Sequence, residues 1–341
     1  MDLSTFPLLD RLRGCSRVLL AGAGGGFDVY AAVPLAVHLH RAGKTVTLGN
    51  LSFTDLKSTS AERPFPGLYR VEYGSEGPGL VAPAAPGRAG LGKGLTVEPS
   101  NRIRDYFPER ALARWLRGRE LPFPVWAFER SGVPSLRAAY QHLVGLTEAD
   151  AVVLVDGGSD SLMRGDEAGL GTPAEDALSL CAACGLEVRE RLLACLGFGV
   201  DRFHGVCHSQ FLEAVADLTR SGAFLGVQAL LPAMEEARLY IHAVEHACLE
   251  MPTHQSIVNT SVASAVEGRF GDAHRIRRTS GNELYINPLM ALYWGFELDA
   301  VARRLLYYDE LVGTQHYAEV GAVIRQFRSR CQVRGWQDIP L

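Results

Sequence analysis

The stretch that decides the fold is VLLAGAGGGFDVYAAVPL, residues 18–35. It opens with an apolar run that reaches Gly22, which is typical of a buried strand in a parallel sheet. Three glycines follow at 24–26, and the apolar residues after them recur at helical spacing as far as Gly43. A second apolar strand, KTVTLGNLSF, occupies 44–53. This order predicts a β-α-β unit with a right-handed crossover.

The alternation of strands and helices continues to about residue 200. Helices are expected at 108–118 and 134–146 and after Thr172 as N-cap, and strands at 123–129, at 150–158 and within 187–199. This alternation predicts an α/β protein with a Rossmann-like, doubly wound, mostly parallel sheet. A Pro- and Gly-rich region at 57–100 interrupts the pattern. We expect a surface insertion there, with short hairpins or a lid as the alternatives.

The second half of the chain has a mostly helical pattern. We expect helices at 209–222, 232–250, 286–306 and 317–330, and a short apolar run at 223–231 could add a strand. The sequence therefore predicts a single α/β domain over 1–341. Its β-α-β core lies at 15–205, and a helix-rich part at 206–341 packs on that core.

The composition restricts the class of protein. Of the 341 residues 47% are hydrophobic, and the net charge is −4, so no basic surface for nucleic acid is expected. No run of 18 apolar residues that could cross a membrane occurs, and the N-terminus does not resemble a signal peptide. The seven cysteines lie mostly in apolar contexts, which is typical of reduced thiols in the cytoplasm. We therefore expect a cytoplasmic protein whose partner is a small molecule, not a nucleic acid or a membrane.

The glycine loop departs from the dinucleotide fingerprint. Gly22 and Gly24 match the first two glycines of G-x-G-x-x-G, but Phe27 stands in place of the third. Asn50 stands where an acidic residue would bind the ribose of NAD. NAD is therefore not the expected cofactor.

The loop still has the composition of a ligand site. Asp28 falls in the first turn of the expected helix, where its carboxylate takes the place in which a phosphate would bind. We predict a ligand site formed by Gly24, Gly25, Gly26, Asp28 and Asn50. The carboxylate of Asp28 would bind a hydroxyl or an amine of the ligand, or a metal ion. The alternative is that Asp28 only caps the helix.

A second loop, LVDGGSDSLMRGDEAGLGTPAED at 154–176, is rich in glycine and carboxylates. Asp156 ends a buried strand and Asp160 follows it, and hard cations prefer such oxygen ligands. We predict that these two aspartates are catalytic and bind a divalent cation, Mg²⁺, Mn²⁺ or Ca²⁺. Sugar hydroxyls are the alternative ligand, and a polar surface loop is the alternative without function.

Three charged residues further along the same loop are candidate ligand-binding residues: Arg164, Asp166 and Glu167. Arg164 either binds a carboxylate or phosphate of the ligand or pairs with Asp166.

Two histidines, His204 and His208, lie four residues apart around an expected helix start. We predict a general acid or base among them, with Asp201 placed to orient the imidazole. Metal binding by the pair and a purely structural role are the alternatives.

Six blocks of the sequence together resemble a known family: GAGGGFDV, NLSF, YFPERALARWL, VDGGSDSLMRGDEAGLGTPAEDALS, GFGVDRFHGVCH and ELYINPLMALYW. The chain resembles an uncharacterised prokaryotic family, domain of unknown function eleven fifty-two, from about residue 15 to 310. The resemblance implies one family domain over most of the chain. It implies no activity, so the site has to be argued from its chemistry.

These observations predict an enzyme that acts on a small polyhydroxylated or nucleoside-like metabolite. We expect 24–28 and 156–167 to meet at the carboxyl edge of the sheet, where a divalent cation would orient sugar hydroxyls and activate water for hydrolysis, for example of an N-glycosidic bond. The alternatives are an atypical nucleotide-cofactor enzyme and a non-catalytic small-molecule-binding protein. The aromatic stretches LYWGF and LLYYDEL could also pack against a second copy in a homodimer.

Overall fold

The computed structural model describes residues 6–72, 106–281 and 284–339. At its centre lies a nine-stranded sheet with the order β3-β4-β5-β2-β1-β6-β7-β11-β8. The strands are β1 (Arg17–Gly22), β2 (Thr45–Ser52), β3 (Glu62–Phe65), β4 (Leu68–Val71), β5 (Val125–Glu129), β6 (Ala151–Asp156), β7 (Glu190–Leu196), β8 (Phe224–Ala229) and β11 (Leu292–Glu297). The five strands from β5 to β7 run parallel, and the two strands at each edge pair antiparallel. The predicted mostly parallel α/β sheet is confirmed.

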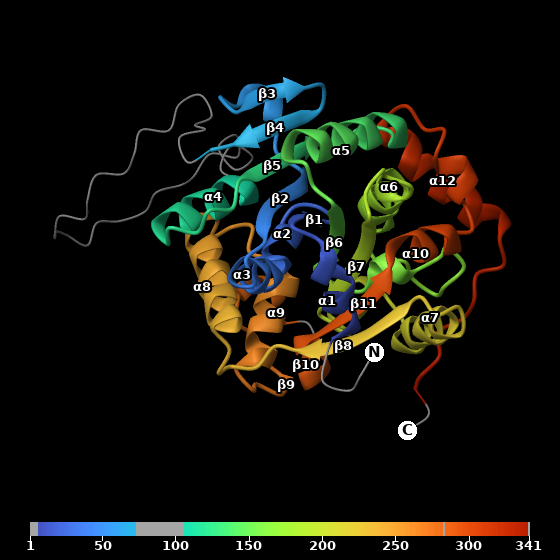
Figure 1. Ribbon diagram of the computed structural model, residues 1–341. Coiled ribbons are helices and arrows are strands. Elements are labelled where there is room, and N and C mark those ends of the chain that lie inside the picture. Colours follow the sequence, from blue (N-terminus) through green and yellow to red (C-terminus); the bar gives the residue numbers. More distant parts are fainter. Residues whose placement is uncertain (1–5, 73–105, 282–283, 340–341) are drawn as a thin grey trace, which may run out of the picture.

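Helices cover both faces of this sheet (Figure 1). One face carries α1 (Pro7–Arg11), α2 (Asp28–Ala31), α3 (Val33–Arg41), α4 (Pro108–Gly118), α8 (Glu235–Glu250) and α9 (Ile257–Val266). The other carries α5 (Val133–Thr147), α6 (Pro173–Ala183), α7 (His208–Arg220), α10 (Leu298–Arg304), α11 (Tyr308–Leu311) and α12 (Tyr317–Arg330).

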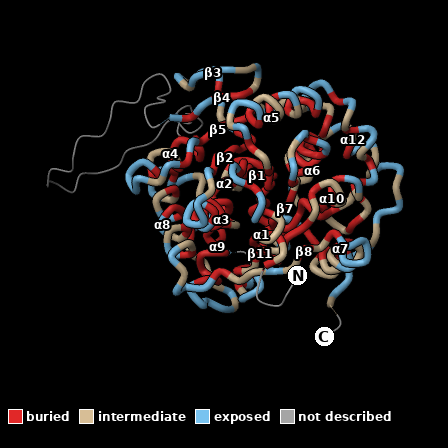
Figure 2. The backbone as a smooth tube through the Cα atoms, viewed as in Figure 1, coloured by how far each residue is buried: buried red, intermediate tan, exposed pale blue. Residues whose placement is uncertain are grey.

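The central strands are buried on both faces, as Figure 2 shows by their red colour. Along β1, Val18 and Leu20 point into one hydrophobic core, whereas Leu19 and Ala21 point into the other. This two-sided burial explains why the sequence of β1 is a continuous apolar run and not an alternating one.

The helix expected at 286–306 is wrong over its first half. That stretch contains the end of β10 (Tyr285–Ile286), a short 3₁₀ turn at Pro288–Ala291, then β11, and only then α10. Tyr293 and Phe296 of β11 are buried in opposite cores, so the strand has apolar residues on both faces and lacks the alternation of a half-buried strand. The LYWGF stretch therefore lies inside the sheet and not on a helix that could meet a second copy.

The run at 223–231 does form a strand, β8, and the beginning of the Pro- and Gly-rich region forms the hairpin β3–β4, which pairs with β5. Residues 73–105, and with them the alternative of a lid, lie outside the described residues.

All seven cysteines carry free thiols. Within the described ranges, no helix has the length and apolar character needed to span a bilayer.

Candidate metal and ligand site

The candidate site lies where the strand order changes direction. From β1 the chain continues into β2 and, after the edge hairpin β3–β4, into β5, all on one side of β1. The next strands, β6 and β7, lie on the other side of β1. Because β1 and β6 are parallel neighbours, the loops that follow them separate at their carboxyl ends. In open α/β sheets this switch point is where ligands bind. The loops in question are the glycine loop and the carboxylate loop.

Hydrogen bonds from two backbone N–H groups fix the shape of the glycine loop. The N–H of Gly24 donates to Asp28 Oδ2 over 2.6 Å, and the N–H of Gly26 donates to the carbonyl of Leu51 over 3.0 Å. Gly25 and Gly26 have φ values of +80° and +58°, a region that favours glycine. The loop therefore places Asp28, the first residue of α2, at the mouth of the sheet.

Three aspartates meet at this point: Asp28, Asp156 and Asp176. One carboxylate oxygen of each lies within 4.8 Å of an oxygen of the other two. Asp156 is the last residue of β6 and Asp176 lies in the first turn of α6, and both are buried, whereas Asp28 is partly exposed. The sequence predicts that the loops carrying Asp28 and Asp156 meet at the carboxyl edge of the sheet, and the structure places these two aspartates together.

The three carboxylates differ in their hydrogen bonds. Asp156 Oδ2 accepts from the hydroxyl of Ser161 over 2.5 Å and from its N–H over 3.2 Å. Neither oxygen of Asp176 has a hydrogen-bond partner among the described residues, although its side chain is buried. Among the described residues, no lysine or arginine forms an ion pair with Asp28, Asp156 or Asp176. A buried carboxylate without donor or counter-charge is costly, so Asp176 requires a proton or an added cation.

The electrostatics of the three groups agree with this requirement. Burial raises the pKa of Asp28, Asp156 and Asp176 well above the usual value, and the negative charge of the nearby Asp160 raises all three further. A cation bound between the carboxylates would favour their charged forms instead.

Asp160 and Asp201 flank the three aspartates. Asp160 Oδ2 accepts from the N–H of Thr172 over 2.7 Å and from its hydroxyl over 3.0 Å. Burial and the charge of Asp201 raise the pKa of Asp160 to about 7. Asp201 in turn accepts from the N–H of Ser159 over 2.5 Å and from its hydroxyl over 3.0 Å.

A histidine completes this side of the site. His204 Nδ1 lies 3.9 Å from Asp201 Oδ1, and the contact with Asp201 raises the pKa of the imidazole. Asp201 is close to Asp156, because a Cβ added to Gly158 would lie 2.7 Å from Asp201 Oδ2 and 3.1 Å from Asp156 Oδ1. Of the two predicted histidines, His204 is thus the one that lies beside an aspartate of the site.

The family assignment follows from the part of the chain that carries these residues. A family model described as "Protein of unknown function (DUF1152)" matches residues 116–330. This chain belongs to the DUF1152 family. No curated protein matches it. The matched region contains Asp156, Asp160, Asp176 and His204, whereas Asp28 and the rest of the glycine loop precede it.

The second predicted histidine of this DUF1152 chain has other contacts. His208 begins α7, its ring lies 5.4 Å from the ring of Phe198, and its Nε2 lies 3.4 Å from the carbonyl oxygen of Gly199. Burial lowers the pKa of His208, which favours the neutral imidazole. These contacts support a packing role.

Asn50 lies beneath the glycine loop. Its Nδ2 donates to the carbonyl of Gly26 and to Glu109 Oε1, both over 2.7 Å. Both side chains are fully buried, and burial raises the pKa of Glu109 to about 7. The amide that stands in place of the NAD-binding acid thus supports the loop from below, and no local sequence pattern indicates its partner Glu109.

Arg164, Asp166 and Glu167 form a network of their own. Arg164 pairs with Asp166 over 2.9 Å, and Arg334 of the C-terminal tail pairs with the same carboxylate over 3.0 Å. Glu167 accepts from the N–H groups of Arg164 and Gly165. The described contacts do not join this network to Asp156. The structure thus contains the pairing of Arg164 with Asp166 that the sequence left as one of two alternatives.

Asp176 is the site residue that sequence reasoning missed. The TPAED stretch indicates a helix start, and Asp176 is not among the residues that the sequence predicts to bind a ligand. One sign was present: like Asp28, Asp176 lies in the first turn of a helix that follows a glycine-rich loop.

Proposed function

We propose that this protein is a divalent-cation-dependent enzyme that hydrolyses a bond in a small polyhydroxylated or nucleoside-like metabolite. The ion is held by Asp28, Asp156 and Asp176. The observation that carries the proposal is the state of Asp176, whose two buried oxygens lack donors and lie beside two further carboxylates.

The geometry suits a hard cation. Mg²⁺ binds oxygens at about 2.1 Å and Ca²⁺ at about 2.3–2.6 Å, so two oxygens on one ion lie at most about 4.2 Å apart for Mg²⁺ and about 5.2 Å apart for Ca²⁺. The three aspartate oxygens lie within 4.8 Å of one another, a limit that is inside the Ca²⁺ range and roughly 0.6 Å above the Mg²⁺ range. The group contains no thiolate or imidazole, which favours Mg²⁺, Mn²⁺ or Ca²⁺ over softer metals. Three carboxylates also leave coordination positions for water and for substrate hydroxyls.

The neighbouring residues supply the remaining chemistry. A bound cation orients hydroxyls and lowers the pKa of a bound water. In the hydrolysis, water adds its hydroxyl to the carbon of the cleaved bond and the leaving group receives a proton. His204 is the proposed proton donor, because Asp201 lies beside its ring and raises its pKa. Asp160, with a pKa of about 7, is the proposed acceptor of the proton from water.

The test is consumption of a metabolite that depends on the ion. Purified protein is incubated with nucleosides, nucleotides and sugar phosphates, with Mg²⁺, Mn²⁺ or Ca²⁺ or with chelator, and products are followed by mass spectrometry. We expect one compound class to be hydrolysed only with added ion, and Asp156→Asn to abolish the reaction. Binding of a compound without turnover would contradict the enzymatic proposal and favour a binding protein.

A further inference from the structure

An arginine follows β5 at the same edge of the sheet. The guanidinium of Arg130 lies over the ring of Phe53, 5.3 Å from its centre, and over the ring of Tyr317, 5.1 Å from its centre. The side chain is exposed and forms no ion pair with an acid of the described ranges, whereas the adjacent Glu129 is paired with Lys57 over 2.6 Å. Among the described residues, Arg130 is thus a positive charge held between two rings and without a carboxylate partner.

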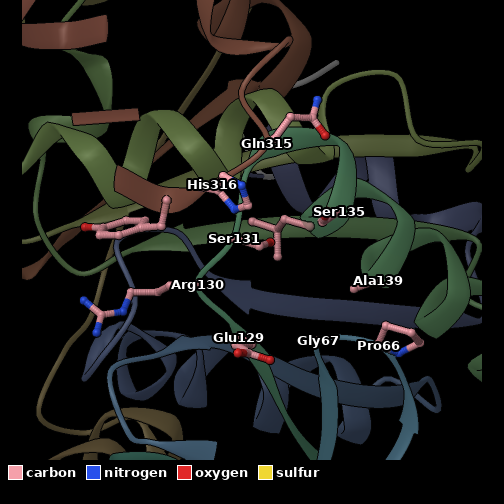
Figure 3. A pocket seen from close by; sticks show the side chains of 11 residues that line it. Pro66, Gly67, Glu129, Arg130, Ser131, Ser135, Ala139, Gln315 and His316 are labelled. Carbon is pink, nitrogen blue, oxygen red and sulfur yellow. The ribbon is translucent and has the colours of Figure 1, made fainter. Parts of the chain in front are cut away.

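Arg130 lines a cavity of about 320 Å³ between the end of β5, the start of α5 and the segment before α12. Figure 3 shows Gln315 and His316 above Ser131, with Glu129 below and Arg130 to one side. The hydroxyl of Ser131 and the imidazole of His316 therefore lie together in the cavity, and the guanidinium of Arg130 lies at its rim. These groups can all donate hydrogen bonds to an oxyanion.

Each aromatic ring beside Arg130 contacts a segment that leads into the acidic cluster formed by Asp28, Asp156 and Asp176. The ring of Phe53 lies against the glycine loop, since a Cβ on Gly26 would lie 3.0 Å from Phe53 Cε2. The hydroxyl of Tyr317 donates to Glu175, the residue before Asp176. The cavity and the acidic cluster are therefore parts of one edge.

The spacing along this edge can be estimated from the sheet. Arg130 follows β5 and Asp156 ends β6, and these strands are three positions apart in the order β5-β2-β1-β6. At about 4.8 Å between neighbouring strands, the two positions lie roughly 14 Å apart. A small molecule bound to the cation can extend toward Arg130 over this distance only if it has a group beyond its sugar ring.

We propose that Arg130 binds the phosphate of the substrate, so that the substrate of the proposed enzyme is a phosphorylated sugar or a nucleotide. A guanidinium donates two parallel hydrogen bonds to a phosphate, and stacking on two rings holds its plane in place. This inference rests on the proposed function for the identity of the substrate, but Arg130 and its cavity can be tested without the ion.

The first experiment measures binding of inorganic phosphate by calorimetry in the presence of chelator. We expect the wild type to bind phosphate and Arg130→Gln to bind it at least about tenfold more weakly, since a charge-assisted hydrogen bond is lost. Arg220→Gln, which changes an exposed arginine outside the cavity, is the matched control and should bind as the wild type does. Equal binding by Arg130→Gln and the wild type, or no binding by the wild type, would overturn the inference.

The second experiment links the two ends of the edge. Ribose 5-phosphate, ribose and inorganic phosphate are titrated with and without Mn²⁺. We expect Mn²⁺ to strengthen binding of ribose 5-phosphate and Asp176→Asn to remove this gain. Arg130→Gln should weaken binding of ribose 5-phosphate without affecting binding of Mn²⁺. Phosphate binding with no gain from Mn²⁺ would show an independent anion site and overturn the link. Absence of Mn²⁺ binding itself would instead contradict the proposed function, so the two failures are distinguishable.

Discussion

Gly24 and Asp176 face each other so closely that a methyl group does not fit between them. A Cβ added to Gly24 would lie 3.0 Å from Asp176 Oδ1 and 2.9 Å from Asp28 Oδ2. The glycine of the first loop thus allows two carboxylates, one from each side of the switch point, to approach each other.

Gly24→Ala should therefore weaken cation binding. The added methyl pushes the carboxylates of Asp28 and Asp176 apart, and we expect at least a tenfold loss of affinity, about 1.4 kcal/mol, with the fold retained. Isothermal titration with Mn²⁺ measures the affinity and circular dichroism the fold. Gly118→Ala is the control, because a Cβ there meets nothing within 4 Å. An unchanged affinity in Gly24→Ala would show that this contact is not part of a metal site.

The dependence of stability on pH should differ with and without the ion. The raised pKa values of Asp28, Asp156 and Asp176 mean that the folded protein binds more protons than the unfolded chain between the usual carboxyl pKa and the raised one. Without a divalent cation the free energy of unfolding should therefore fall as the pH rises from about 4 through about 7, the pKa of Asp160. With Ca²⁺ or Mn²⁺ present this fall should be reduced or reversed, because the ion binds the deprotonated carboxylates.

Urea unfolding at several pH values, with chelator and with ion, measures this effect. Asp176→Asn removes one buried charge and should raise the free energy of unfolding at about pH 8 in chelator, by on the order of 1–3 kcal/mol. A wild type whose stability in chelator rises over this pH range would be at odds with a buried acidic cluster.

His204 should be more important for activity than His208. If His204 donates a proton to the leaving group, His204→Gln lowers kcat/KM by about 10²–10⁴. The rate should fall as the pH rises through the pKa of His204, which Asp201 raises, so Asp201→Asn should move this fall to lower pH. The pH profile of the reaction found in the metabolite screen measures both. His208→Gln, whose ring contacts Phe198, serves as the comparison, and a profile identical in wild type and Asp201→Asn would refute the role of the pair.

Asn50 should stabilise the loop and not a ribose. Asn50→Asp replaces the donor to the carbonyl of Gly26 and to Glu109 by a second acceptor, so we expect a loss of about 1–3 kcal/mol in the free energy of unfolding. Adding Glu109→Gln restores a donor between the two side chains and should recover part of this loss. Denaturant titration of Asn50→Asp and of the double variant measures both effects. If Asn50→Asp alone were as stable as the wild type, the structural role of Asn50 would be contradicted.

The sequence predicts the parallel core well because buried strands followed by glycine have few other interpretations. The first strand, the glycine loop and the Asp156 strand end all lie where local patterns indicated. The stretch around Tyr293 was mistaken for a helix because a strand buried on both faces shows no period of two.

Two of the three aspartates in the acidic cluster could be predicted from the sequence. Asp28 and Asp156 follow strands, so the rule for parallel sheets brings them to one edge. Asp176 reaches the same point through the path of the carboxylate loop before α6, which no local pattern specifies. Glu109 likewise meets Asn50 only through the packing of α4 on the sheet.

The most direct test of the cation site is calorimetric titration of Mg²⁺, Mn²⁺ and Ca²⁺ into wild type, Asp176→Asn and Asp309→Asn. Asp309 is exposed on α11 and provides the matched aspartate outside the cluster. We expect at least one of these ions to bind to the wild type and to Asp309→Asn at one ion per chain, and Asp176→Asn to lose this binding. No binding by the wild type, or equal binding by all three proteins, would contradict it.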